Sequence, residues 1–217
     1  MTSTTPPSMP PSPWRVGPRG ARLRGWLRRE GLPLVLLLGL LLVARSSLAN
    51  HYHVPSGSME PTLLPGDRVV VDMRAYGLRV PFTQWAVWGG DAPARGDVVV
   101  FRSPSDGIRL IKRVVAVGGD RVDLVDGRLA INGAPLADAS DAAEDFGRVQ
   151  VTLNLDSGGG PDLNGLHVRD GQVLVLGDHR GASIDGRYFG FVPAAAIYGQ
   201  ARGVFWRTGD GFGWRKL

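Results

Sequence analysis

The chain has 217 residues, 43% of them hydrophobic, so it is long enough to bury a core and is not a disordered tail. It contains no cysteine, which excludes a disulfide framework, a thiolate nucleophile and a cysteine-based metal site. The formal net charge is +5, but a cluster of arginines precedes the one long apolar stretch, so the excess charge indicates a membrane-flanking segment rather than a nucleic-acid surface.

The chain begins with a basic segment that leads into an aliphatic one. Residues 1–30 are rich in Pro, Ser, Thr and Arg, and we predict a largely disordered cytoplasmic tail. Residues 32–44 are almost entirely aliphatic, and we predict a transmembrane signal-anchor helix over 31–50. The positive-inside rule then places everything after residue 50 on the outer face of a bacterial cytoplasmic membrane that the chain crosses once.

A cleavable signal peptide is the alternative to a retained anchor. The aliphatic run is shorter than the roughly 20 residues of a spanning helix. Ser47 and Ala49 also supply the small residues that a cleavage site needs three positions and one position before the cut. The sequence leaves open whether the chain is processed between Ala49 and Asn50.

The remainder of the chain is predicted to be mainly β. Its 31 Gly and 16 Pro punctuate short runs rich in Val, Leu and Ile, which is typical of strands joined by turns. We divide it into a main β domain over 51–119 and 173–217 and a small inserted β subdomain over 120–172. Turn signals at Asp126-Gly127 and Asn132-Gly133 set the insertion apart.

A serine-containing loop follows the predicted anchor. Residues 53–63 have the sequence HVPSGSMEPTL, in which two prolines and a glycine favour a tight extended loop around Ser58. A serine hydroxyl needs a base within hydrogen-bond reach and nearby donors for the oxyanion if it is to act as a nucleophile. The pattern Ser-x-Ser-Met-x-Pro-Thr-Leu over residues 56–63 resembles the nucleophile motif of the type I signal peptidases.

This resemblance implies roles for three residues of the loop. Ser58 would attack the scissile carbonyl, while the Ser56 hydroxyl and the Ser58 backbone N–H would hold the oxyanion. Met59 would pack in the substrate cleft. The resemblance further implies an all-β catalytic domain, an insertion without a catalytic group, and no metal or other cofactor.

Aromatic residues gather in two further places. Phe82, Trp85 and Trp88 lie in a loop-rich stretch, and Phe212 and Trp214 lie near the end of the chain beside basic residues. Because Trp and Tyr partition to the lipid headgroup region, we expect these stretches to contact the bilayer. Ordinary core packing is the alternative.

A lysine in an apolar strand is the candidate base. Residues 95–101 and 108–118 predict a β-hairpin, and Lys112 lies among Leu, Ile and Val in its second strand. Such surroundings disfavour the ammonium form and lower the pKa of a lysine. Of the 25 basic residues only Lys112 and Lys216 are lysine, and arginine cannot be deprotonated. We expect Arg113 to point to the opposite face and to be structural.

Residues 112–120 and 177–193 resemble two further motifs of the same family. By this resemblance Ser183 would hydrogen-bond the lysine amine and hold it towards Ser58. The residues that would form an ionic scaffold below the site are Asp178, Asp185 and Arg187.

The last motif departs from the family pattern. His179, Gly181 and Ala182 replace the Asn, Asp and Asn most often found there, so contacts of those side chains are absent or altered. His179 also permits a Ser-His-Asp arrangement with Asp178 or Asp185 as the orienting acid. We favour Lys112 because it lies in its full motif.

We therefore expect a membrane-bound serine endopeptidase that removes signal peptides from exported preproteins through an acyl-enzyme. The substrates would carry small residues at the first and third positions before the cut. The alternatives are a Ser-Lys self-cleaving protease related to repressor-type autoproteases and an inactive membrane-tethered β binding module. The expected partners are the preprotein and the lipid bilayer, with neither nucleic acid nor metal.

Overall fold

The computed structural model describes residues 27–38, 49–79, 86–138 and 142–217. The chain divides into two compact units, Met1–Val43 and Ala44–Leu217. In the first unit, η1 (Leu27–Gly31) is a π-helix and residues 32–38 continue as α-helix. Within the described ranges, no helix is both long and apolar enough to cross a membrane. Most of the predicted tail, and the 39–48 part of the predicted anchor, lie outside the described residues.

The predicted helix over 31–50 does not reach its predicted end. Strand β1 (Ala49–His53) begins at Ala49 and pairs antiparallel with β2 (Arg68–Asp72), with Ala49 opposite Asp72. Ala49 and Asn50 are in a strand rather than a helix because their backbone takes part in the β1–β2 ladder.

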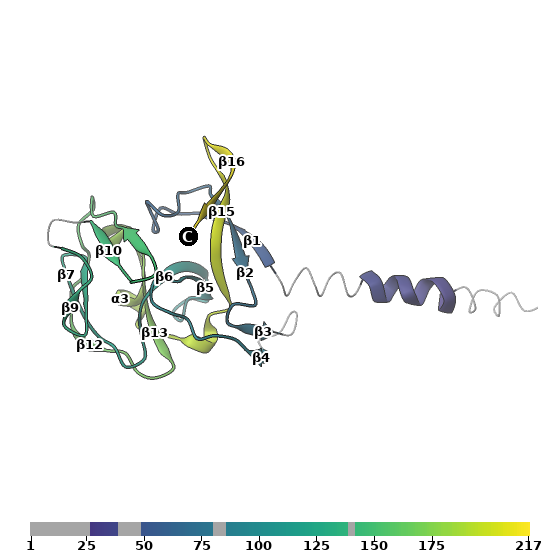
Figure 1. The fold of residues 1–217 in the computed structure, drawn as a ribbon, viewed down its shortest axis with the longest axis horizontal. Coiled ribbons are helices and arrows are strands. Elements are labelled where there is room, and N and C mark those ends of the chain that lie inside the picture. Colours follow the sequence, from purple (N-terminus) through teal and green to yellow (C-terminus); the bar gives the residue numbers. More distant parts are fainter. Residues whose placement is uncertain (1–26, 39–48, 80–85, 139–141) are drawn as a thin grey trace, which may run out of the picture. The chain divides into compact units, whose positions relative to one another are not determined.

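The second unit is mainly β, as predicted. Its largest sheet has eight strands among the described residues, in the order β1-β2-β15-β5-β6-β13-β14 with β16 added beside β15 (Figure 1). The further strands of this sheet are β5 (Val98–Arg102), β6 (Arg109–Val117), β13 (Gln172–Leu176), β14 (Val192–Pro193), β15 (Gly199–Arg207) and β16 (Gly211–Lys216).

The predicted hairpin around Lys112 is confirmed. Strands β5 and β6 pair antiparallel, with Val99 opposite Lys112 and Val98 opposite Arg113. Val98 packs in one hydrophobic cluster and Val99 in another, because successive side chains of a strand point to opposite faces. A continuous apolar run such as that of β5 fits a central strand that is buried on both faces.

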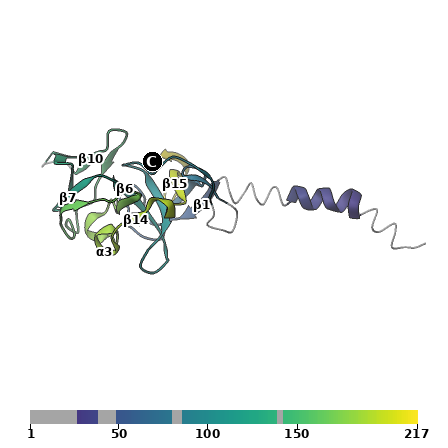
Figure 2. The ribbon, with the colours of Figure 1, turned by 90° about the horizontal axis from the view of Figure 1, so that it is seen from below.

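The 120–172 segment forms sheets of its own. A four-stranded sheet has the order β12-β7-β8-β9, and β10 pairs with β11 (Figures 1 and 2). The strands are β7 (Arg121–Val125), β8 (Arg128–Ile131), β9 (Ala134–Pro135), β10 (Ala143–Asp145), β11 (Gln150–Thr152) and β12 (Leu163–His167). Both predicted turn pairs join successive strands of the four-stranded sheet. Asp126 and Asn132 have φ of 49° and 55°, and each is followed by a glycine with positive φ.

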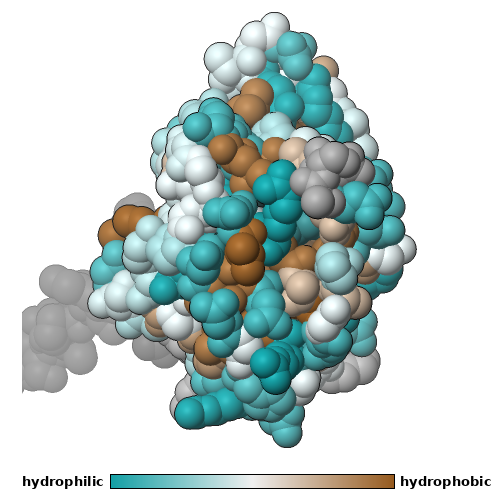
Figure 3. Space-filling view, turned by 90° about the vertical axis from the view of Figure 1, so that its left-hand side faces the viewer, coloured by the Kyte–Doolittle hydropathy of each residue, from teal (hydrophilic) through white to brown (hydrophobic). Residues whose placement is uncertain are grey.

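This segment shares its hydrophobic core with the main sheet. Val115 and Leu174 of the main sheet pack in one cluster with Val122, Leu124 and Leu129. On the side of the molecule where β7, β9 and β12 lie, hydrophilic residues are interleaved with several hydrophobic areas (Figure 3). The buried apolar side chains of the segment pack against β6 and β13, whereas Val125 is 53% exposed.

The remaining elements are short. Strands β3 (Gly77–Arg79) and β4 (Ala86–Gly89) pair with each other; Trp88 is in β4, whereas Phe82 and Trp85 lie outside the described residues. The short helices are η2 (Arg180–Ala182), α3 (Gly186–Phe189) and η3 (Ala194–Ala196). In α3 the Asp185 side chain caps the first turn by accepting from the Arg187 backbone N–H at 3.2 Å.

Candidate active site

Ser58 lies in a loop between β1 and β2 that is closed at its base. The Val54 N–H donates to the Asp67 carbonyl oxygen at 2.9 Å, and the Gly66 N–H donates to the Val54 carbonyl oxygen at 2.8 Å. Ser58 itself is half-buried. The β1–β2 ladder thus fixes where the loop leaves and rejoins the sheet.

Met59 lies in the core, so its predicted place in the substrate cleft is wrong. Its side chain is 0% exposed and packs in one cluster with Leu63 and Val69. The cavity beside Ser58 is not lined by Met59. An unbranched apolar thioether gains more free energy from full burial than from a cleft wall, and here it anchors the loop directly beside Ser58.

Lys112 and Ser58 are brought together from different parts of the chain. The Lys112 Nζ lies 2.5 Å from the Ser58 Oγ, and Lys112 is only 3% exposed. Burial lowers the pKa of Lys112 to about 8, because the ammonium is poorly solvated between the β-strands. The predicted juxtaposition of a serine and a lysine with a lowered pKa is therefore present in the fold.

Two carboxylates partly counteract this shift. The negative charges of Asp185 and, to a smaller extent, Asp178 favour the ammonium and so raise the pKa of Lys112 relative to burial alone. Each carboxylate has its own arginine. The Arg187 Nε lies 2.8 Å from Asp185 Oδ1, and the Arg113 Nη2 lies 2.7 Å from Asp178 Oδ2.

The ionic scaffold differs from the predicted one. Asp178 pairs with Arg113 rather than with Arg187, so the site has two buried ion pairs where a single group was expected. Arg113 lies on the face of β6 opposite to Lys112, as predicted, and this is why it meets a different carboxylate. The sequence offered no sign of this pairing, because 65 residues separate the partners.

The expected hydrogen bond between Ser183 and the lysine amine is not formed. Ser183 is 5% exposed, and its Oγ has no hydrogen-bond partner within the described part of the chain. The hydroxyl instead lies against Gly177. A Cβ added at Gly177 would lie 2.3 Å from the Ser183 Oγ and 2.4 Å from the Ser58 carbonyl oxygen.

Gly177 is therefore a residue of the site that the sequence did not single out. It lets the segment after β13 approach the backbone of Ser58 more closely than any side chain would allow. Its N–H also donates to Asp185 Oδ2 at 2.9 Å. The available sign was its place immediately before Asp178.

Ser56 lies beside Ser58. Its Oγ is 3.4 Å from the Ser58 Oγ, and the residue is exposed. Both serines open onto a cavity of about 430 Å³. The cavity is lined by Ser56, Gly57, Ser58, Glu60, Pro65, Leu110, Lys112, His179, Ala182 and Ile184.

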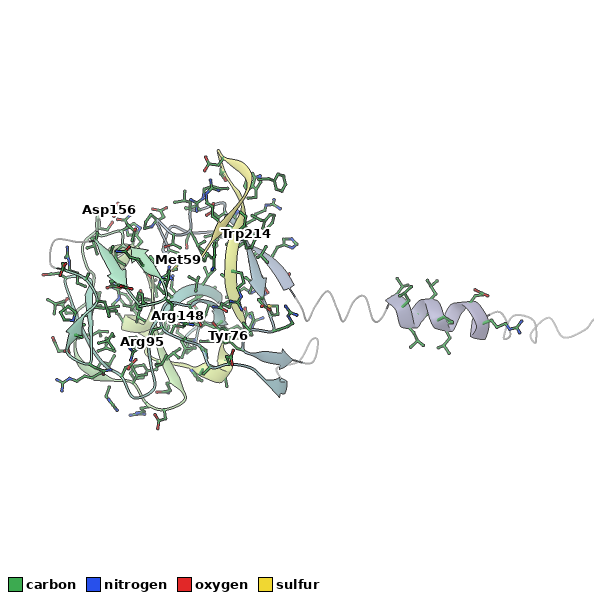
Figure 4. All side chains as sticks on the ribbon, viewed as in Figure 1. Met59, Tyr76, Arg95, Arg148, Asp156 and Trp214 are labelled. Carbon is green, nitrogen blue, oxygen red and sulfur yellow. The ribbon has the colours of Figure 1, made fainter. Side chains whose placement is uncertain are left out.

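His179 lines the same cavity, but its side chain does not hydrogen-bond the Ser58 hydroxyl. Its Nε2 lies 2.7 Å from Asp156 Oδ1 and its Nδ1 lies 3.8 Å from Glu60 Oε2 (Asp156 is labelled in Figure 4). Its backbone N–H donates to the Ser58 carbonyl oxygen at 3.3 Å. Since Asp178 and Asp185 are paired with arginines, neither orients His179 as a Ser-His-Asp arrangement would require.

Comparison with known proteins is consistent with this geometry. The chain matches the family model described as signal peptidase, peptidase S26, over residues 27–206. A signal peptidase I from Leptolyngbya laminosa is 32% identical over 213 residues, covering 94% of this chain and 90% of the relative. A signal peptidase I from Pseudomonas fluorescens is 36% identical over 196 residues, covering 78% and 69%. A probable signal peptidase I-2 from Synechocystis sp. is 32% identical over 191 residues, covering 83% and 73%.

Proposed function

The chain belongs to the signal peptidase family, peptidase S26, as a serine endopeptidase, and we propose that it removes signal peptides from exported preproteins with Ser58 as nucleophile and Lys112 as general base. The observation that carries this proposal is the 2.5 Å approach of the Lys112 Nζ to the Ser58 Oγ. The motif around Ser58 and the apolar surroundings of Lys112 support the same assignment.

The reaction begins with proton transfer from Ser58 to Lys112. With a pKa of about 8, roughly one tenth of Lys112 side chains are neutral at pH 7 and able to accept a proton. As the proton moves to Nζ, the Ser58 Oγ attacks the scissile carbonyl carbon and its oxygen becomes an oxyanion. The Ser56 hydroxyl and the Ser58 backbone N–H are proposed to donate to that oxyanion.

The tetrahedral intermediate then collapses. The Lys112 ammonium donates its proton to the leaving amine of the mature protein, and the signal peptide stays on Ser58 as an ester. Neutral Lys112 next takes a proton from water as the water oxygen attacks the ester carbonyl carbon. The Lys112 ammonium then returns this proton to the Ser58 Oγ as the ester C–O bond breaks, which releases the signal peptide with a new carboxyl terminus. Asp178 and Asp185 keep negative charge near Lys112 in every step. Because each is paired with an arginine, neither carboxylate is proposed to take the proton from Lys112.

The substrate preference is proposed to be for small residues at the first and third positions before the cut. The cavity has apolar lining from Leu110, Ala182 and Ile184 beside the polar Ser58 and Lys112. Apolar pockets discriminate between side chains that differ in size by the loss of contacts or by clashes. A substitution series at these two substrate positions would test the preference.

We also propose that the chain is anchored once in the bacterial cytoplasmic membrane with its catalytic domain on the outer face. The aliphatic run over 32–44 and the arginines before it support the anchor and its orientation. Phe212 and Trp214 on β16 are 84% and 60% exposed, next to Lys216, which supports contact of this hairpin with lipid. Phe212→Ser with Trp214→Ser should then weaken stimulation of cleavage by phospholipid vesicles.

A direct test compares the wild type with Lys112→Arg in detergent, using a preprotein as substrate. Arginine keeps the positive charge but cannot be deprotonated, so this variant should cleave no faster than Ser58→Ala. Equal cleavage by wild type and Lys112→Arg would remove the lysine-base mechanism. The self-cleaving protease and the binding module have no observation of their own in their favour.

A further inference from the structure

A buried ion pair joins the 120–172 segment to the segment that follows β13. Arg180 Nη2 lies 2.6 Å from Glu144 Oε2 and Nη1 lies 2.9 Å from Oε1, and both side chains are 0% exposed. Glu144 belongs to β10, whereas Arg180 begins η2, only three residues before Ser183. Removing two charges from water is unfavourable, so this pair needs its full set of hydrogen bonds to persist.

The remaining hydrogen bonds of the pair reach both sides. The Arg180 Nε donates to the Gly177 carbonyl oxygen at 3.1 Å, and Nη1 also donates to the Gly127 carbonyl oxygen in the β7–β8 turn. Glu144 Oε1 accepts from the Leu129 N–H at 3.0 Å. The pair thus connects Gly177, which touches Ser58, to two strands of the inserted segment.

Hydrogen bonds to backbone groups also join residues 177–187 to the inserted segment. The Arg180 N–H donates to the Asn154 carbonyl oxygen at 3.0 Å, and the Asn154 N–H donates to the Asp178 carbonyl oxygen at 3.0 Å. The Arg187 guanidinium donates to the carbonyl oxygens of Arg180 and Gly159, each at 2.6 Å. Residues 177–187 are therefore held by the inserted segment as well as by β6, where Arg113 pairs with Asp178.

These same residues surround the proposed dyad. They supply both carboxylates whose charge acts on Lys112, and the His179 N–H that donates to the Ser58 carbonyl oxygen. Residues 177–187 have little apolar anchoring of their own, since their most buried side chains are the charged ones of Asp178, Arg180, Asp185 and Arg187, whereas Ile184 is 72% exposed. Their position therefore depends on ion pairs with other segments, namely with Arg113 of β6 and Glu144 of β10.

We infer that Glu144 is a positioning residue for the reaction: through Arg180 it holds residues 177–187 against Ser58 and Lys112, so that the inserted segment is part of the catalytic apparatus. This inference rests on the proposed function of the Ser58–Lys112 dyad. The prediction that the insertion carries no catalytic group is unaffected, because Glu144 would act through Arg180 rather than on the substrate.

A role confined to fold stability is the competing explanation, and a double variant separates the two. Glu144→Leu with Arg180→Met removes both charges together and leaves apolar side chains, which often restores the stability that a single charge removal costs. It does not restore the bonds of Arg180 to Gly177 and Gly127. A stability role predicts recovered activity, and a positioning role does not.

The experiment uses the full chain in detergent with a preprotein substrate, and measures kcat, KM, the pH profile and the unfolding temperature. Glu144→Gln should lower kcat by about tenfold or more with KM within about twofold, because the reacting groups rather than substrate binding are disturbed. Arg180→Lys, which keeps the charge but not the forked geometry, should also lower kcat. Asp210→Asn, at the partly exposed pair with Arg215, is the control and should change neither constant.

The kcat values of the folded variants decide the inference. A stable double variant with low kcat and a shifted pH profile supports positioning, and so does a low kcat in a folded Arg180→Lys. Wild-type kcat in the double variant or in folded Glu144→Gln overturns it. If Lys112→Arg is inactive while the Glu144 variants are fully active, the dyad stands and only this inference fails; if Lys112→Arg is fully active, the proposed function itself fails.

Discussion

The two segments that meet at Lys112 are held in place by different forces. The Ser58 loop is anchored by apolar side chains, with Met59 and Leu63 both 0% exposed in one hydrophobic cluster. Residues 177–187 are anchored by buried charges, of which Asp178 and Asp185 pair with arginines from β6 and α3. The Ser58 loop thus rests mainly on apolar packing, with one ion pair at its base in which Arg207 Nη2 lies 2.6 Å from Asp67 Oδ2. The carboxylates that act on Lys112 instead belong to a segment held chiefly by ion pairs.

The difference teaches what apolar packing supplies at one segment and what buried carboxylates supply at the other. A serine needs a fixed position, which close packing provides. A lysine base needs a pKa that burial has lowered towards neutrality, and the charges of nearby carboxylates limit how far the pKa falls. The following predictions test this division, from the largest expected effect to the smallest.

Breaking either support should cost stability by a comparable amount but through different physics. Asp178→Asn leaves the Arg113 guanidinium buried without its counter-charge and should cost about 3–5 kcal/mol of unfolding free energy. Met59→Ala should cost about 2–5 kcal/mol through the cavity it leaves. Denaturant unfolding measures both. Met59→Leu is the matched control, with a loss below about 1.5 kcal/mol; an Asp178→Asn as stable as wild type would contradict the charged support.

Gly177→Ala should separate the two segments directly. The new Cβ would lie 2.4 Å from the Ser58 carbonyl oxygen, and a backbone atom cannot yield that much without moving the loop. We expect kcat to fall about 100-fold, because shifts of about 1 Å between reacting groups have effects of that size. Gly89→Ala is the control, since nothing lies within 4 Å of its Cβ. Unchanged kcat in Gly177→Ala would show that the close approach is not needed.

The pH dependence should report the charged support. Because the proposed mechanism uses the neutral amine of Lys112, kcat/KM should rise tenfold per pH unit below the Lys112 pKa of about 8 and level off above it. Asp185 raises the pKa of Lys112, so Asp185→Asn should move the midpoint to lower pH. Met59→Leu should leave the midpoint in place. A flat profile from mildly acidic to alkaline pH would speak against a lysine base.

His179→Asn should have the smallest effect. The partner of its Nε2, Asp156, has a side chain that is 67% exposed, and contacts of this kind contribute little free energy. We expect kcat/KM to change less than about fivefold, the equivalent of about 1 kcal/mol. A loss as large as that of Lys112→Arg would instead return the histidine to the mechanism.

The sequence by itself determined what depends on local pattern. The Ser58 loop follows from its two prolines and its motif, and the hairpin follows from apolar runs around a turn. The lysine was identifiable because it is one of two in an arginine-rich chain and lies in an apolar strand, where burial lowers its pKa. The turns at Asp126-Gly127 and Asn132-Gly133 could likewise be predicted, since few residues accept positive φ.

Only the tertiary structure decided which distant groups meet. The pairing of Arg113 with Asp178 and of Arg180 with Glu144 spans 65 and 36 residues, and no local periodicity encodes a partner at that distance. The same holds for Met59 and Ser183, whose residue types fit either a cleft or an interior. Their places were settled by packing and close approach between segments, which depend on how the whole chain crosses itself rather than on any stretch of it.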